Sequence, residues 1–330
     1  MSNSIKKLQV PPPPGHQPTP QRGKSRRPRK RQGNRPLAVA LALMFLWICV
    51  LMVGLPLILL GGDGNRVNLL LLGVDRRDGS DWAYRTDTVI VAGVGAGTGD
   101  AVLLSIPRDL QLPIPGFGDD RINTANVYGY VEDYPGGGPA LVGATIRSNF
   151  GIPIDGYLMA DFGAFVRMVD ALGGIEIDVS ETLHDTRYPD PRPGDPHAFK
   201  TVHFDPGLQT MDGQRALEYA RSRMSTSDFD RARRQQEVLV AIRQKALSPG
   251  SLLRLPGLGL IVLDSLETNL SPREVMALGL LAVRLDPARL QRVVLEPPLV
   301  YGHVRADGAA IELPNWELIN PVIDEHFRTP

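Results

Sequence analysis

The chain has 330 residues, of which 43% are hydrophobic, and this composition is typical of a globular protein that buries a substantial core. Its single cysteine, Cys49, excludes an intramolecular disulfide. The formal net charge of +0 conceals an asymmetry, because residues 1–36 carry ten Lys or Arg and no Asp or Glu, which leaves 26 basic and 36 acidic residues in the remainder. A basic N-terminal tail therefore precedes an acidic body.

Residues 37–60 form an uninterrupted apolar segment between the tail and the body. As a helix, the segment would extend about 36 Å at 1.5 Å per residue, which is enough to cross a bilayer. A cleavable signal peptide is the alternative, but its apolar region is shorter and ends in small residues. The sequence therefore predicts an uncleaved signal anchor that crosses the cell membrane once.

The positive-inside rule gives this predicted anchor an orientation. It places residues 1–36 in the cytoplasm and residues 61–330 outside it. The tail is too rich in proline and charge to fold, and its cations would lie against anionic headgroups of membrane lipid. Nucleic-acid binding by the tail is the alternative, but we expect none, because short basic runs often match such motifs by chance.

After a glycine-rich linker at 61–66, the body alternates between strand and helix patterns. Strands are predicted at 67–74, 88–94, 101–106, 175–179 and 290–295, and helices at 139–150, 161–172, 212–221, 228–247 and 271–285. The glycines at 95–99 favour a hairpin between the second and third strands. Residues 181–207, rich in Pro, Asp and His, predict a long exposed loop. This order predicts an α/β domain over residues 67–330, with helices covering a mixed central sheet.

Charged residues follow or precede the first three predicted strands. If the first two strands are antiparallel neighbours, Asp75 and Asp87 meet at one edge of the sheet. Arg108 reaches the same edge, and Arg85 precedes Asp87 by two residues. A pair of carboxylates suits Mg²⁺, or Mn²⁺ in its place, because Mg²⁺ takes one or two protein carboxylates and completes its shell with water and phosphate oxygens. A structural network of ion pairs is the alternative.

Five arginines crowd around a predicted helix start at Ser227. They are Arg221, Arg223, Arg231, Arg233 and Arg234. Guanidinium groups pair bidentately with phosphate, and the N-terminus of a helix also favours an anion.

One face of the same helix changes from polar to apolar along its length. Arg231, Gln235, Val238 and Ile242 lie three and four residues apart, which places them on that face. A ligand with a phosphate head and a lipid tail fits this face, with Val238 and Ile242 contacting the tail. An amphipathic helix that buries its apolar residues in the core is the alternative.

Motifs in the body occur in an order that resembles the LytR-CpsA-Psr family. The matching residues lie within 67–247 and are Asp75, Arg85-Thr-Asp87, Ser105-Ile-Pro-Arg-Asp109, Arg121-Ile-Asn123, Asp161-Phe162, Leu172-Gly-Gly-Ile175, Ala216 to Arg223, Asp228, Arg231 and Arg234-Gln235. The resemblance implies a phosphotransferase, or glycopolymer ligase, that moves teichoic acid, capsular or similar glycan from polyprenyl pyrophosphate to peptidoglycan. It also implies Mg²⁺ at Asp75 and Asp87. The implied pyrophosphate contacts are Arg85, Arg108, Arg221, Arg223, Arg231 and Gln235.

The implied reaction is attack by a sugar hydroxyl on the glycan-linked phosphorus, with polyprenyl phosphate leaving. Arg108 would stabilise the developing charge, and Asp75, or Asp87 when it does not bind metal, is a candidate to accept the hydroxyl proton. Two alternatives remain. A hydrolase would use the same residues with water as the acceptor, whereas a non-catalytic membrane-bound envelope regulator would tolerate the loss of Asp75 and Asp87.

Overall fold

The computed structural model describes residues 66–75, 84–95, 99–190, 195, 197–223, 227–252 and 266–328. The predicted tail, the predicted membrane anchor and the predicted linker up to residue 65 lie outside these described residues. Within them, no helix has both the length and the apolar composition that a membrane crossing requires.

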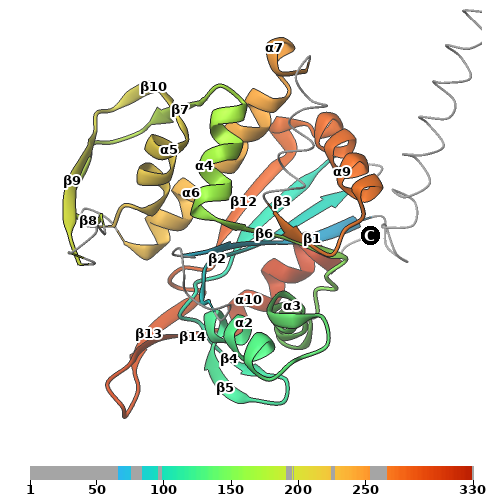
Figure 1. The fold of residues 1–330 in the computed structure, drawn as a ribbon. Helices are drawn as coiled ribbons and strands as arrows, with labels where there is room; N and C mark the ends of the chain where they lie inside the picture. The colour runs from blue at the N-terminus through green and yellow to red at the C-terminus, as the bar shows by residue number, and fades with distance from the viewer. Residues whose placement is uncertain are drawn as a thin grey trace, which may run out of the picture. The chain divides into compact units, whose positions relative to one another are not determined.

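A six-stranded mixed sheet lies at the centre of the described part of the chain (Figure 1). Its strand order is β11-β6-β1-β2-β3-β12. The strands are β1 (Arg66–Val74), β2 (Thr86–Gly95), β3 (Ala101–Ser105), β6 (Gly156–Asp161), β11 (Glu267–Thr268) and β12 (Leu290–Val294). β2 is antiparallel to both β1 and β3, whereas β6 runs parallel to β1 and β12 parallel to β3. The predicted mixed sheet and the predicted hairpin are therefore confirmed.

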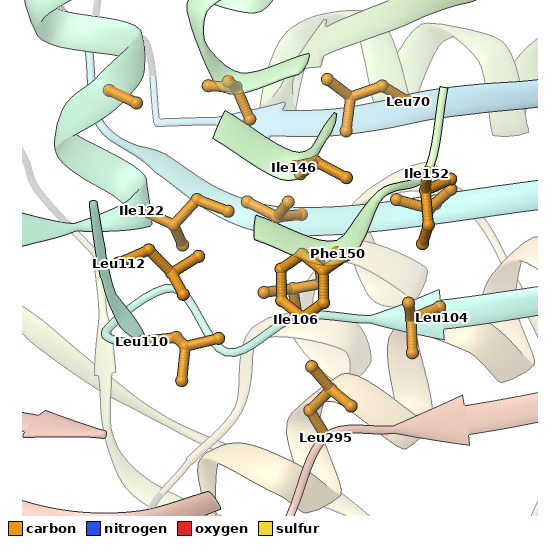
Figure 2. Close-up of a cluster of buried hydrophobic side chains, with 14 of the residues drawn as sticks. Leu70, Leu104, Ile106, Leu110, Leu112, Ile122, Ile146, Phe150, Ile152 and Leu295 are labelled. Carbon is orange, nitrogen blue, oxygen red and sulfur yellow. The ribbon is translucent and has the colours of Figure 1, made fainter. Parts of the chain in front are cut away.

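Helices cover both faces of this sheet (Figure 1). One face carries α2 (Ile122–Val131), α3 (Gly137–Phe150) and α10 (Trp316–Ile323), and the other carries α6 (Asp228–Ala246) and α9 (Pro272–Arg284). Because side chains alternate along a strand, Leu70 enters the core on the first face and Leu69 the core on the second. Figure 2 shows the first core, where Leu70 and Leu104 of the sheet lie with Ile146 and Phe150 of α3.

Six elements enclose a second core beside the sheet (Figure 1). They are α4 (Phe162–Ala171), β7 (Ile175–Val179), β8 (Leu183–Pro189), β9 (Phe199–Phe204), β10 (Gly207–Met211) and α5 (Gly213–Arg221). β7 pairs with β10, and β8 pairs with β9, each antiparallel. One side of α6 also packs into this core through Val238 and Ala241. The helix therefore separates the second core from the sheet.

The long exposed loop predicted over 181–207 is wrong, because β8 and β9 form a hairpin there and β10 begins at its end. Leu183, Tyr188 and Phe204 are buried in this hairpin, whereas His184 and His203 are exposed. The polar residues that suggested a loop are thus largely the outward-facing half of a strand alternation. The prolines in this segment interrupt the alternation, so the sequence does not indicate a strand.

The helices predicted from the sequence agree with the structure. Those expected at 139–150, 161–172, 212–221, 228–247 and 271–285 are α3, α4, α5, α6 and α9. The side chain of Ser271 accepts from the backbone of Glu274, and the Glu274 side chain accepts from the backbone of Ser271, which confirms a capping box at the start of α9.

Two further hairpins lie on the side of the sheet that α2 covers (Figure 1). The first joins β4 (Gln111–Ile114) to β5 (Gly118–Arg121), and the second joins β13 (Val300–Val304) to β14 (Ala310–Pro314). A parallel bridge between Leu110 and Glu312 connects the second hairpin to the segment that follows β3. The remaining short elements are α7 (Pro249–Leu252), η1 (Pro287–Arg289) and η2 (Asp324–Arg328).

Candidate active site

Two acidic residues lie where β1 ends and β2 begins. Val74 pairs with Thr86 across these strands, after an irregularity in register at Gly73 and Val74. Asp75 and Asp87 each follow one of these paired residues, so both are positioned at one edge of the sheet. β1 and β2 approach each other closely here, since a Cβ on Gly73 would lie 3.0 Å from the Cβ and Oγ1 of Thr88.

Arg108 reaches the same edge from the segment after β3. Its Nη1 lies 2.5 Å from Asp87 Oδ1, and its Nε lies 3.3 Å from Asp109 Oδ2. Burial alone would lower the pKa of Arg108, but Asp87 and Asp109 outweigh it and leave the pKa raised. The N-terminus of α2 holds this segment, because the Asn123 N–H donates to the Arg108 carbonyl at 3.2 Å and the Ile122 N–H to the Leu110 carbonyl at 2.9 Å.

Arg221, at the C-terminus of α5, contacts three elements at once. Its guanidinium lies 3.8 Å from the centre of the Phe162 ring, and its Nη1 donates to the Tyr188 hydroxyl at 3.3 Å. Its Nη2 lies 3.5 Å from Asp75 Oδ2. These contacts fix the plane of the guanidinium and join the second core to the end of β1.

The N-terminus of α6 brings a further arginine to the site. Ser227 and Asp230 form a capping box that starts this helix. Arg231, 6% exposed, lies one turn into the helix with its Nη1 2.9 Å from Asp228 Oδ1. This contact is an ion pair without hydrogen-bond geometry, so Nη1 has no hydrogen-bond acceptor among the described residues. Arg223 approaches the same carboxylate, with its Nε 3.7 Å from Asp228 Oδ1.

The arginines of the site repel one another. Burial and the nearby Arg223 lower the pKa of Arg231 to about 10, and partial burial and Arg108 lower the pKa of Arg223. Both guanidinium groups remain protonated at neutral pH. After burial, the neighbouring arginines contribute most to the lowering, and an anionic ligand would relieve this repulsion.

A cavity of about 260 Å³ opens among these groups. Its polar lining comes from the sheet edge, the first turns of α6 and the β13–β14 hairpin, and its apolar lining comes from the sheet and α6. The polar residues include Asp87, Arg108, Asp109, Asp228, Arg231, Gln235 and Glu312, and the apolar residues include Val89, Ile106, Phe229 and Val294.

Five of the predicted site residues lie at this cavity or are linked to it by an ion pair. Asp87, Arg108, Arg231 and Gln235 line it, and Arg223 is linked to it through Asp228. Asp75 and Arg221 pair with each other at the end of β1 and do not line the cavity. Arg85 is exposed, does not line the cavity and makes no ion pair with any described residue.

Two of the five clustered arginines have structural partners instead. Arg233 pairs with Asp230 and Glu296. Arg234 is buried and donates to the backbone carbonyls of Tyr219 and Ser222, which ties α6 to the end of α5. Helical spacing could not separate these two from Arg231, because Glu296 and the carbonyl groups of Tyr219 and Ser222 reach α6 from other parts of the chain.

Val238 and Ile242 do not form an open surface for a lipid. Val238 is 2% exposed inside the second core, and Ile242 is partly buried against the same core. The helix face that carries them meets α5 and β7. Val238 and Ile242 therefore fit the alternative interpretation, in which an amphipathic helix buries this face in the core.

Two residues at the site carry no clear sequence signal. Asp185 of β8 is 2% exposed and accepts from the Ser222 hydroxyl at 2.8 Å and from the Arg223 N–H at 3.0 Å. Its position two residues after the buried Leu183 is the one pattern that could have indicated an inward-facing carboxylate. Glu312 lies in a short strand whose contact with the site depends entirely on tertiary structure.

The LytR_cpsA_psr family model matches residues 60–297. The chain therefore belongs to the LytR-CpsA-Psr family, as its motifs indicate.

Relatives and solved structures are consistent with this membership. The chain is 33% identical over 218 residues to the polyisoprenyl-teichoic acid–peptidoglycan teichoic acid transferase TagU of Oceanobacillus iheyensis, covering 66% of this chain and 62% of TagU. It is 35% identical over 200 residues to the probable cell wall biosynthesis protein LcpB of Corynebacterium glutamicum, covering 56% and 43%. Each match spans less than two thirds of the relative. A structure of TagT bound to LIIa-WTA is 26% identical, with a TM-score of 0.61, covering 80% of this chain and 92% of that chain.

Proposed function

We propose that this protein is a membrane-anchored phosphotransferase that moves a glycan from polyprenyl pyrophosphate to peptidoglycan. One observation carries the proposal: four arginines gather where the sheet edge meets the start of α6. Arg108 and Arg221 pair with Asp87 and Asp75 at the sheet edge, and Arg223 and Arg231 pair with Asp228 of α6. An excess of positive charge at a helix N-terminus is suited to pyrophosphate. The name of the relative TagU and the ligand of TagT support a donor and an acceptor from the cell wall.

A divalent cation fits the acidic part of this site. Asp75 and Asp87 supply hard oxygen ligands, and no group of three or more His, Cys, Asp or Glu side chains suited to a metal occurs in the described ranges. Two carboxylates match Mg²⁺, or Mn²⁺, because such an ion takes its remaining ligands from water and phosphate. When bound, the ion would draw electron density from the phosphoryl oxygens. Arg108 and Arg221, which pair with these carboxylates, would then turn toward the pyrophosphate.

We place the lipid chain beside the face of the sheet that α6 and α9 cover, because that face is apolar. Leu71 of β1, Leu158 of β6 and Leu239 of α6 are only partly buried there, as are Val275 and Leu278 of α9. Leu71 precedes Asp75 by four residues, a separation of about 13 Å along a strand. A polyprenyl chain beside these residues would place its pyrophosphate at the sheet edge. This position replaces Val238 and Ile242 as the proposed lipid contact.

The reaction then follows from the charges at the cavity. A sugar hydroxyl of peptidoglycan forms a bond to the glycan-linked phosphorus, and the bond from that phosphorus to the bridging oxygen breaks. Polyprenyl phosphate leaves with the electron pair. Arg108 and Arg231 stabilise the negative charge that develops on the phosphoryl oxygens, and Gln235 orients the pyrophosphate. Arg85 would contact the pyrophosphate from the exposed rim.

The proposed location follows from the segment that precedes this domain. Residues 37–60 would anchor the chain as a single membrane span, with the N-terminus in the cytoplasm and the catalytic domain outside. The site would then lie on the side of the membrane where peptidoglycan is found, with its lipid substrate in the adjacent leaflet. We expect no nucleic-acid partner.

The test is a transfer assay with the full chain in detergent micelles. The chain is incubated with a polyprenyl-pyrophosphate glycan, Mg²⁺ and peptidoglycan oligomers, and the products are resolved by mass spectrometry. Glycan joined to peptidoglycan by a phosphodiester supports the ligase. Free glycan phosphate together with polyprenyl phosphate, without joined product, would favour the hydrolase, and no Mg²⁺-dependent product would contradict both enzymes.

A further inference from the structure

The geometry points to Glu312 as the general base that accepts the proton of the acceptor hydroxyl. This inference rests on the proposed transferase function and names the residue that completes its site. Glu312 lies outside residues 60–297, the part of the chain that the family model matches.

The backbone fixes Glu312 beside the phosphate-binding arginines. Its N–H donates to the carbonyl of Asp109 at 3.0 Å, in the segment that carries Arg108. Arg121 reinforces the connection, because its Nη2 donates to the Ala310 carbonyl at 2.7 Å while its Nη1 lies 3.5 Å from Asp109 Oδ1. The β13–β14 hairpin is thus tied to the site at two points. The Glu312 side chain lines the same cavity as Arg108.

The carboxylate of Glu312 has unused capacity to accept a proton. Its Oε2 is shielded from solvent and accepts no hydrogen bond from any residue in the described ranges. The residue paired with it across the hairpin is Gly302, where a Cβ would lie 3.9 Å from Glu312 Oε1. No side chain from that paired position covers the carboxylate. The hairpin therefore leaves room at Oε1 for an incoming hydroxyl.

The charges around Glu312 also suit a base. Burial, together with Asp109 and Asp228, raises the pKa of Glu312. The cavity further places Asp87, Arg108 and Arg231 around the same space. A carboxylate whose pKa is raised toward the working pH removes a proton more effectively than an ordinary glutamate.

The two acidic residues expected from the sequence are less suited to this role. Asp75 pairs with Arg221 at 3.5 Å, and Asp87 pairs with Arg108 at 2.5 Å. Both are also the proposed metal ligands. These two carboxylates already face cations, so they hold the metal while Glu312 acts on the hydroxyl.

The hydroxyl proton moves to a Glu312 oxygen as the hydroxyl oxygen forms its bond to the glycan-linked phosphorus. The bond between that phosphorus and the bridging oxygen breaks, and its electron pair leaves on polyprenyl phosphate. The proton on Glu312 then returns to solvent.

The test compares Glu312→Gln with the control Glu317→Gln, an exposed glutamate on α10, in the full chain. Both variants are assayed for transfer as a function of pH and for binding of octaprenyl pyrophosphate with Mg²⁺. For Glu312→Gln we expect the turnover number to fall about 10²- to 10⁴-fold. Because only the deprotonated glutamate acts, the unaltered rate should fall as pH falls through the Glu312 pKa, and the variant should lose this acidic limb. Its affinity for octaprenyl pyrophosphate should stay within about threefold.

Three results would overturn the inference. The first is a Glu312→Gln turnover within about threefold of the control. The second is a matching loss of transfer and octaprenyl pyrophosphate binding, which would show a structural role. The third is an acidic limb that persists unchanged in the variant. Failure of the unaltered chain to transfer glycan would contradict the proposed function itself, and that outcome is seen without any variant.

Discussion

Arg221 and Asp75 join two parts of the molecule that fold around separate cores. Arg221 Nη2 lies 3.5 Å from Asp75 Oδ2, with one residue at the end of α5 and the other at the end of β1. The stack on Phe162 and the hydrogen bond to Tyr188 also hold the guanidinium. The site is therefore assembled where the sheet meets the second core, and each part supplies groups that the other lacks.

Replacing Arg221 by lysine tests the value of this geometry. The charge is kept, but the planar fork and the stack on Phe162 are lost. We expect the affinity for octaprenyl pyrophosphate to fall about tenfold or more, measured by calorimetric titration. Arg215→Lys is the matched control, because Arg215 stacks on Phe204 at 3.7 Å and pairs with Glu218, whereas Arg221 pairs with Asp75. Equal affinities of the two variants would argue against a role for Arg221 in ligand binding.

Asp185→Ala tests whether the β8–β9 hairpin positions the arginines. The change removes the acceptor for the Ser222 hydroxyl and the Arg223 N–H. We expect the free energy of unfolding to fall by about 1–3 kcal/mol in urea denaturation, with weaker pyrophosphate binding as a second effect. The control is Asp178→Ala, an exposed aspartate on β7, which should stay within about 0.5 kcal/mol. A variant with lowered stability and unchanged binding would confine Asp185 to a structural role.

Gln236→Leu tests the seating of α6 on the sheet. The buried amide of Gln236 donates to the carbonyl oxygens of Leu103 and Val293 and contacts Ser105 Oγ. Its loss would leave buried acceptors unsatisfied, so we expect a destabilisation of about 1–3 kcal/mol by urea denaturation. Gln244→Leu, on an exposed position of the same helix, should change stability by less than about 0.5 kcal/mol. An equal change in stability in the two variants would mean that the Gln236 amide does not hold α6 on the sheet.

Removal of the metal tests the role of the two carboxylates. Addition of EDTA should abolish transfer by the unaltered chain, and excess Mg²⁺ or Mn²⁺ should restore it. In Asp87→Asn the metal concentration needed for half-maximal activity should rise about tenfold or more, since a neutral amide replaces an anionic ligand. Asp205→Asn, at an exposed position outside the cavity, should not alter this value. Transfer that persists in EDTA would exclude a required metal.

The sequence predicts the regular parts of this fold because their signals are local. Continuous apolar runs indicate β1 and β2. Ser227 and Ser271 indicate helix starts, because each forms a capping box with the residue three positions later. The meeting of Asp75 and Asp87 follows from strand order alone. The β8–β9 hairpin escapes prediction, because exposed histidines and prolines obscure a short alternation of buried residues.

The site is less predictable where its groups depend on distant partners. Arg231 and Arg234 lie on one short stretch of α6, yet one faces the cavity and the other binds the backbone of α5. Val238 has the spacing of a ligand-contacting residue and is a core residue instead. Glu312 reaches the site through a bridge to Leu110 that no local pattern indicates.

In the proposed reaction, the acceptor attacks the phosphorus that carries the glycan. The most direct test uses a polyprenyl-pyrophosphate glycan with ³²P at that phosphorus, the full chain with Mg²⁺, and peptidoglycan oligomers as acceptor. If the acceptor attacks this phosphorus, the label moves into peptidoglycan with the glycan and leaves unlabelled polyprenyl phosphate. Label that remains in the lipid product would show attack at the sugar carbon and would contradict transfer of the phosphoryl group.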